Sequence, residues 1–586
     1  MVGSFLIQTI CAAGLLLPQA DRASESDSRA AKLLPGSTAI TIEIPKPVEL
    51  LKSIVEHPIH DRAKKDKVLR KAYMSKEFLQ VKTGVAFAEF AMGMKWHEAV
   101  NVLAGRGMTF ALDAETDGGL VIVQSGNADK LPGLIKTLLQ FVNNQRKQDG
   151  KPEIEKDQYR DVTVYKVDDV AIAVHEDLLL LTQSGKLGKK VLDALLDGTN
   201  DSLASRETWK ASRGTVSADD SAIGFIDMQE VRDRGGIKNL LEGTKSNPFA
   251  EFLLGGVFES LSESPYVLAG LRLDDESLRL TAKTPYDATK VSEPREFYFG
   301  PEGKGRAPTM LSLDGSIGGA TVYRDVARMW QYAGDLFDQN VNDQFAEAGT
   351  ALSTLFAGKD FVEEILAEIK PNWQLVVTRK NFEDVLPRPA IKLPSFALVG
   401  EFKDAKTMNS EMKRVFQSMI GFFNVVGAME SGNPQLDQDI EIVDGMKIYA
   451  SWFVPTPEDK KSTEASIHFN FSPSLALGEK HFVLASSTDL AMSAMKATAE
   501  ATSSADSDTA NMDFEVRGAS LKQVLNDNRE QLVANNMLED GNSRQEAERQ
   551  IDLLLGIVGW IDRLSARLQP SDDQLELRLN LKLREE

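Results

Sequence analysis

Histidine side chains are the first candidates for chemistry in this sequence, because imidazole binds metal ions and transfers protons near neutral pH. Residues 57–61 (HPIHD) hold two histidines three positions apart and a carboxylate, which would share one face if the segment were helical. Pro58 disfavours the helical conformation at His57, so a helix that begins near Pro47 is predicted to end there. We therefore expect His57 and His60 to have structural or surface roles.

The other histidines do not complete a known catalytic motif. His97 is followed by Glu98, but Asn101 stands where the HExxH helix of zinc proteases has its second histidine. His175 and His481 lie in two similar predicted hairpins, at positions that do not correspond. This argues against a catalytic histidine with the same role in both hairpins.

Two acidic segments, 197–202 (DGTNDS) and 338–343 (DQNVND), begin like the calcium loop of an EF-hand. Such a loop needs glycine at its sixth position and glutamate at its twelfth. Neither segment has that glycine, and Thr208 and Gly349 occupy the twelfth positions. We predict a helix-capping loop for the first segment and a polar helix face for the second.

Motifs for phosphate binding and for nucleophilic catalysis are missing. Residues 300–305 (GPEGKG) contain Gly-Lys but lack the spacing and the hydroxyl residue of a P-loop, and neither GxGxxG nor GxSxG occurs. The sequence therefore nominates no catalytic, cofactor-binding or metal-ligating residue, and no cofactor. A hydrolase that uses a pair of carboxylates stays open, because such acids are recognised by their separation in space.

The composition is that of a globular protein with more than one domain. The chain has 586 residues, of which 42% are hydrophobic and 26% are charged. Its formal net charge of -20 repels nucleic acid and anionic lipid, so we expect no nucleic-acid partner. Beyond the N-terminal segment, no stretch is long and apolar enough to span a membrane.

The N-terminal segment has the pattern of a secretory signal peptide. Residues 5–17 (FLIQTICAAGLLL) form a largely apolar run, and the predicted cleavage point lies between residues 20 and 23. A retained membrane anchor is the alternative, but the run is short for the hydrocarbon layer. Cys11 is the only cysteine and would be removed, and Ile10 before it disfavours a lipid-modification site. We expect an exported protein of the periplasm or cell envelope.

Two parts of the chain resemble each other. Residues 173–187 (AVHEDLLLLTQSGKL) and 476–490 (ALGEKHFVLASSTDL) share five of fifteen positions, and both read as a hairpin that leads into a helix. Flanking blocks follow in the same order: 120–123 with 396–399, 131–142 with 408–423, 161–165 with 445–449, 223–227 with 512–516, 231–241 with 521–533, and 271–280 with 568–577. We interpret this order as an internal gene duplication. The alternative is that strand-helix units resemble one another in any protein.

The predicted fold class is α+β, with two structurally related lobes. Tight polar turns join neighbouring strands, which favours antiparallel hairpins covered by helices over a doubly wound parallel sheet. We place the signal peptide at 1–23, the first lobe at 33–285, a Pro- and Gly-rich linker at 286–307 and the second lobe at 308–586. The second lobe is expected to begin with a weak strand near 310–313 and to contain an exposed insertion at 454–465.

The start of the first lobe carries a family resemblance. Residues 33–37 (LLPGS), a strand at 39–44 and Pro45-Lys46-Pro47 opening a helix resemble an uncharacterised exported bacterial family, a domain of unknown function frequent in planctomycetes and cyanobacteria. Residues 159–195 and 202–205 are similar to that family too. The resemblance implies export and two tandem lobes, and it implies no catalytic residue.

Our leading hypothesis is a non-enzymatic binding or scaffolding protein of the periplasm or cell envelope, with an unknown protein or envelope component as its partner. The competing hypothesis is a carboxylate- or metal-dependent hydrolase outside the cytoplasm. A third is an assembly protein that associates with itself through sheet edges or helix faces.

Overall fold

The computed structural model describes residues 28–65, 70, 89, 93–234, 236–383, 385–429, 434–443, 446–462, 464–501 and 510–585. The expected signal peptide, 1–23, lies outside the described residues. The described chain is 45% helix and 28% strand, which confirms the α+β class. It divides into two compact units: Met1–Ile237 with Ser264–Pro285, and Lys238–Glu263 with Tyr286–Glu586.

The first unit contains an antiparallel sheet of ten strands. Its strands are β1 (Thr38–Ile44), β2 (Gly107–Asp113), β3 (Gly118–Gln124), β4 (Glu155–Tyr159), β5 (Val162–Val167), β6 (Val170–His175), β7 (Leu178–Thr182), β8 (Ala222–Asp227), β9 (Tyr266–Leu273) and β10 (Ser277–Pro285). Across the sheet they follow the order β4-β5-β6-β7-β3-β2-β1-β8-β9-β10. β2 and β3 form a hairpin, one of the antiparallel hairpins that the tight polar turns of the sequence predict.

Helices cover both faces of this sheet. They are α2 (Arg29–Leu33), α3 (Pro47–Val55), α4 (Ile59–Lys65), α7 (Trp96–Ala104), α8 (Leu131–Gln148), α9 (Gly185–Asp197), α10 (Glu207–Arg213) and α11 (Met228–Asp233). One core joins α2, α9 and α10 to Leu120, Leu178 and Leu180. The other joins α3, α7 and α8 to Val123, Leu179 and Leu181. Neighbouring residues of a strand thus enter different cores, as the alternation of side chains along a strand requires.

The second unit also contains ten described strands, all antiparallel to their neighbours. They are β11 (Ser316–Tyr323), β12 (Asn372–Thr378), β13 (Ser395–Glu401), β14 (Leu436–Val443), β15 (Met446–Phe453), β16 (Ser474–Leu477), β17 (His481–Ala485), β18 (Met512–Arg517), β19 (Ile561–Pro570) and β20 (Gln574–Leu583). Their order is β14-β15-β16-β17-β13-β12-β11-β18-β19-β20.

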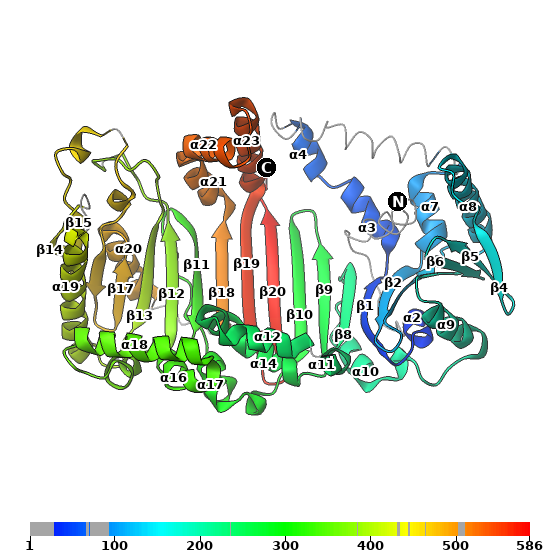
Figure 1. Cartoon of the computed structure of the whole chain (residues 1–586), viewed down its shortest axis with the longest axis horizontal. Coiled ribbons are helices and arrows are strands. Elements are labelled where there is room, and N and C mark those ends of the chain that lie inside the picture. Colours follow the sequence, from blue (N-terminus) through cyan, green and yellow to red (C-terminus); the bar gives the residue numbers. More distant parts are fainter. Residues whose placement is uncertain are drawn as a thin grey trace. The chain divides into compact units, whose positions relative to one another are not determined.

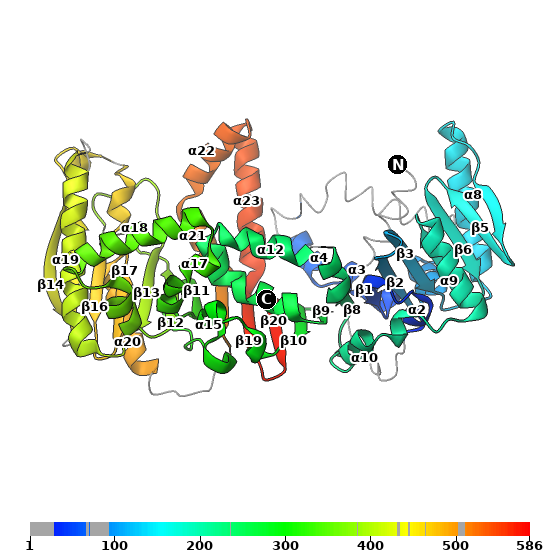
Figure 2. The same cartoon turned by 60° about the horizontal axis from the view of Figure 1, so that its bottom comes forward.

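The helices of the second unit also lie on both sides of its strands. They are α12 (Gly236–Lys245, which begins just before the unit boundary), α13 (Pro248–Ala250), α14 (Gly256–Glu263), α15 (Glu296–Phe299), α16 (Val326–Gln331), α17 (Ala333–Leu336), α18 (Gln339–Leu355), α19 (Ala405–Met429), α20 (Thr488–Ala501), α21 (Gly518–Asp527), α22 (Arg529–Glu539) and α23 (Arg544–Trp560). α20 packs on Val376, Ala397 and Val483, whereas α19 packs on Tyr449 and Leu475. Figure 2 shows α18 and α20 on opposite sides of these strands.

The strand orders of the two units are the same when ten is added to each strand number of the first unit. The pairing register agrees where the sequence resemblance is strongest. Ala173 pairs with Leu180, and Ala476 pairs with Val483; 476 − 173 and 483 − 180 both equal 303. The 303-residue spacing that relates 173–187 to 476–490 therefore also relates the hydrogen-bonded partners within the two hairpins.

The structure differs from the sequence prediction at the expected linker, 286–307. This segment belongs to the second unit and contains Phe297, Tyr298 and Phe299, which are at most 1% exposed. The Pro- and Gly-rich composition reflects tight turns and not a solvated connection, since Gly300 and Gly303 have φ of 73° and 68°. Residues 238–263 likewise group with the second unit, although they precede β9 of the first.

The first strand of the second unit is β11 and not the segment near 310–313, so that expectation is corrected. Residues 310–313 precede a turn at Gly315, whose φ is 69°. β11 reads SIGGATVY, and its two adjacent glycines weaken the strand signal in the sequence. Pairing with β12 and β18 on its two sides compensates for that low intrinsic preference.

Candidate functional site

The strands of the second unit carry an open strip of apolar side chains on one face. Its first row contains one residue from each of six neighbouring strands, each paired with the next: Leu398, Leu375, Ala320, Phe514, Ala566 and Leu579. Directly paired residues of antiparallel strands point to the same face. Leu375 is 42% exposed, and Leu398, Phe514 and Leu579 are each 37% exposed.

A second row lies two residues further along each strand and thus on the same face. It contains Phe396, Val377, Gly318, Val516, Leu564 and Leu581. Phe396 is 48% exposed and Leu564 is 43% exposed. We call these two rows the open strip. Its side chains are all hydrocarbon, so it offers contact area without charged or hydrogen-bonding side chains.

A layer of helices ends at the border of the open strip. The next row on the same face includes Val322, which is 7% exposed, and Met512, Leu568 and Leu577, which pack against α15, α16 and α17. In Figure 1, α16, α17 and α18 lie across one end of the strands, and β11, β12 and β18 continue beyond them. The helix layer therefore covers part of the apolar face and leaves the open strip accessible.

The reverse face of β18 and β19 is polar. Asp513 pairs with Arg567 at 3.4 Å, and Glu515 pairs with Arg563 at 3.1 Å and with Arg517 at 2.7 Å. A two-faced sheet normally turns its apolar side to a core and its charged side to water. Here the charged side follows that rule, while part of the apolar side lacks a covering layer among the described residues.

Arg324, at the end of β11, ties the helix layer to the sheet. Its guanidinium donates hydrogen bonds to the carbonyls of Phe252 at 2.6 Å and Tyr323 at 2.5 Å, and to Asn511 Oδ1 at 2.7 Å. The guanidinium carbon lies 3.4 Å from the ring centroid of Tyr298. Arg324 is completely buried, and this burial lowers its pKa to about 10.

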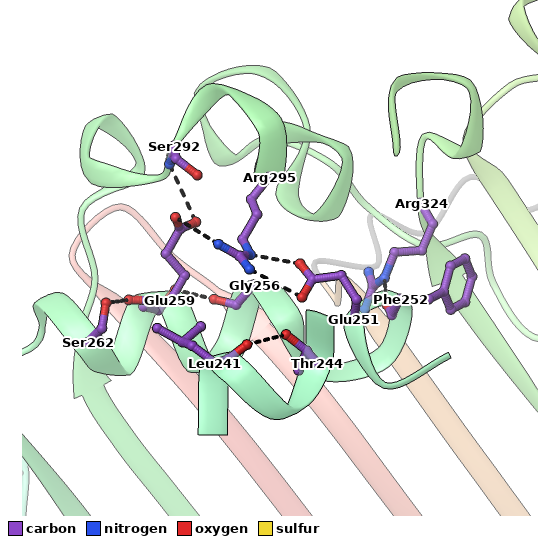
Figure 3. A network of polar contacts seen from close by, with 11 residues as sticks. Leu241, Thr244, Glu251, Phe252, Gly256, Glu259, Ser262, Ser292, Arg295 and Arg324 are labelled. Carbon is purple, nitrogen blue, oxygen red and sulfur yellow. Dashed lines mark hydrogen bonds and ion pairs between the residues drawn. The ribbon is translucent and has the colours of Figure 1, made fainter. Parts of the chain in front are cut away.

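A second cation, Arg295, lies close by in the same layer, and its side chain is 14% exposed (Figure 3). Arg295 donates from Nε to Glu251 at 2.7 Å and from Nη2 at 3.2 Å, and its Nη1 lies 3.5 Å from Glu259. Burial alone would lower the pKa of Arg295, but the hydrogen bond and charge of Glu251, with Glu259, raise it. The paired charges hold residues 251–263 to α15 and so fix the border of the open strip.

The two histidines of segment 57–61, His57 and His60, contact backbone groups. His57 lies between α3 and α4, where Pro58 was expected to end a helix, and its Nδ1 accepts a hydrogen bond from the Ile59 amide at 3.1 Å. His60 Nε2 lies 2.5 Å from the Ile54 carbonyl oxygen. Burial lowers the pKa of His57 and of His481, which begins β17. The open strip contains none of these histidines.

The acidic segments have local roles. Asp197 ends α9 and forms hydrogen bonds with Arg160 at 2.6 and 2.8 Å. Asp338 caps α18, since its Oδ1 accepts from the Val341 amide at 3.0 Å. Among the described residues, no group of three or more His, Cys, Asp or Glu side chains is placed to hold a metal ion. Among the described helices, none is long and apolar enough to cross a bilayer.

Comparisons with known proteins give few matches. No protein-family model matches the sequence, and no curated protein matches it. Solved structures of the treponemal protein TP0453 in crystal forms III, IV and I match with 9%, 8% and 10% identity and TM-scores of 0.24, 0.23 and 0.24. They cover 47%, 44% and 46% of this chain and 86%, 79% and 82% of that chain.

Sequence reasoning missed the open strip, although part of its signal is visible. Residues 574–583 (QLELRLNLKL) alternate strictly between leucine and polar residues, which indicates one apolar face. The alternation does not tell whether helices cover that face. That depends on where α15, α16 and α17 pack, and this packing involves residues 251–263, which are far away in the sequence.

Proposed function

We propose that this chain is an exported, non-enzymatic binding protein that holds an apolar ligand on the open strip. The observation that supports it is the row Leu398, Leu375, Phe514 and Leu579, in which side chains on separate strands are each 37–42% exposed. Contiguous exposed apolar surface of this kind marks binding sites more often than isolated exposed residues do. Covering it releases about 25 cal/mol per Å² of apolar area.

The proposal has three further parts: export of the protein, the resemblance to the planctomycete and cyanobacterial family, and the gene duplication. The shared strand order and the common 303-residue spacing support a duplicated ancestral fold.

The experiment that tests the proposal is titration of the purified protein with anilinonaphthalene sulfonate, a dye that fluoresces on apolar surfaces. Leu375→Gln and Phe514→Gln should each remove most of the dye signal while near-UV circular dichroism stays native. Leu112→Gln is the matched control, because Leu112 is a 53% exposed leucine on β2 of the other unit. An equal signal in all four proteins would contradict the proposal.

A further inference from the structure

We infer that the ligand of the open strip is the single acyl chain of a fatty acid, extended across the strands within the strip. This inference rests on the proposed function and names the ligand class for the same surface. Three properties of the strip support this inference: its length, its width and the pairing of the backbone groups in the strands beneath it.

The length of the open strip suits an acyl chain. The strip crosses six strands, from Phe396 and Leu398 on β13 to Leu579 and Leu581 on β20. Five spacings of about 4.8 Å between neighbouring strands give a length of about 24 Å. One acyl chain spans about half of the ~30 Å hydrocarbon layer of a bilayer, or about 15 Å. A long chain can therefore lie at full length on apolar side chains.

The width of the open strip favours one chain. Its two rows are two residues apart along each strand, which is about 7 Å. On one side the strip ends where Val322 and Leu568 are buried under the helix layer. On the other, β12 leads to Arg379, which forms an ion pair with Asp527 at 2.7 Å. An α-helix with its side chains is about 10–12 Å across, so a bound helix would extend over one of these borders.

The backbone beneath the strip excludes an added peptide strand. β13, β12, β11, β18 and β19 each pair with a neighbour on both sides. An extended peptide lying on this face would find no free backbone groups, and its own buried N–H and C=O groups would stay unsatisfied at a cost of about 1–3 kcal/mol each. An acyl chain has no such groups.

The test is displacement of the bound dye by octanoate, laurate and palmitate, with the full-length protein. Each additional CH₂ should strengthen binding about twofold, because a chain on an open face buries about half of each CH₂, so palmitate should displace the dye at far lower concentration than octanoate. No dye binding to the strip would overturn the proposed function itself. Dye binding that palmitate does not displace would overturn only the acyl chain. Displacement of the dye by two-chain phosphatidylcholine vesicles, without displacement by palmitate, would also overturn the inference of a single acyl chain.

Variants in the middle of the strip test the placement of the chain. Phe514→Gln and Val516→Gln, both on β18, should each weaken palmitate binding about tenfold, because a chain of about 15 Å on a strip of about 24 Å covers the middle wherever it lies. Leu538→Gln, on α22, is the matched control, since Leu538 is 83% exposed and outside the strip. Full palmitate affinity in both β18 variants would overturn the lengthwise placement. Near-UV circular dichroism establishes that each variant is folded.

Discussion

The hydrogen-bond acceptors of Arg324 are backbone carbonyls and the side-chain oxygen of Asn511, so its charge is stabilised by dipoles and by the Tyr298 ring. Its Nη2 is buried without a hydrogen-bond partner among the described residues. A planar guanidinium can satisfy several carbonyls and stack on a ring at the same time, which an ammonium group cannot do. The surroundings of Arg324 therefore require the planar shape of a guanidinium as well as its positive charge.

We predict that Arg324→Lys lowers the free energy of unfolding by at least about 2 kcal/mol, because hydrogen bonds from the charged guanidinium are lost in a buried site. Arg563→Lys is the control: its side chain is 48% exposed, so the change should be within about 0.5 kcal/mol. Urea unfolding followed by fluorescence measures both. Equal effects of the two substitutions would contradict the role given to Arg324.

The pair of Glu251 and Arg295 gives a second prediction. Glu251 is completely buried, and the Arg295 side chain is 14% exposed. Arg295→Met leaves the buried Glu251 carboxylate uncompensated and should lower the free energy of unfolding by about 3–5 kcal/mol. Glu251→Gln should lower it by less, because Arg295 keeps its ion pair with Glu259 at 3.5 Å. The double variant should lose less than the sum of the two, as urea unfolding can show. Additive losses would mean that the two residues are not coupled.

At the scale of elements, the hairpins were the most predictable feature, because apolar alternation and tight turns are local signals. The β2–β3 hairpin and the block at 173–187 are examples. The role of 286–307 was not predictable from composition, since Phe297 to Phe299 became core residues only through contact with distant segments. Whether helices cover the open strip also depends on contacts between segments that are far apart in the sequence, so composition could not predict it.

The junction between α3 and α4 should make the first unit sensitive to acid. Burial holds the pKa of His57 below its ordinary value of 6.5, and neutral Nδ1 accepts the Ile59 amide hydrogen bond. Above about pH 7 the histidine is neutral in both folded and unfolded chains. As the pH falls through 6.5, the unfolded chain binds the proton first, so stability decreases until the folded-state pKa is reached.

His57→Asn removes this titration and keeps an acceptor oxygen. We predict that thermal unfolding temperatures of the wild-type protein fall more steeply than those of the variant between about pH 7 and pH 5. The comparison between the two proteins isolates the histidine from the carboxylates, which titrate in both. Parallel pH profiles would show that His57 makes no such contribution.

At the scale of the whole molecule, the two units do not follow each other simply along the chain. Residues 238–263 follow β8 and α11 along the chain and contribute Glu251 and Phe252 to the second unit. The chain then returns to the first unit, where it forms β9 and β10. A fragment 308–586, the second lobe expected from the sequence, lacks Glu251, Arg295 and Tyr298. A fragment 236–586 contains all three.

We predict that fragment 308–586 is largely insoluble or lacks native near-UV circular dichroism, because Arg324 would lose the Phe252 carbonyl and the Tyr298 ring. Fragment 236–586 should retain both solubility and signal. Expression of the two fragments under the same conditions provides the comparison. Equal yields of folded protein would show that residues 236–307 are dispensable for the second unit.

This path of the chain sets an order of events during synthesis. Between Glu263 and Asn511 the ribosome adds 248 residues (511 − 263). At about 5–20 residues per second this takes roughly 12–50 s. During that interval α12 and α14 have left the exit tunnel while the last acceptor of Arg324 has not yet been translated. Nascent chains of this protein should therefore depend on chaperones that shield the apolar faces of these two short helices until translation is almost complete.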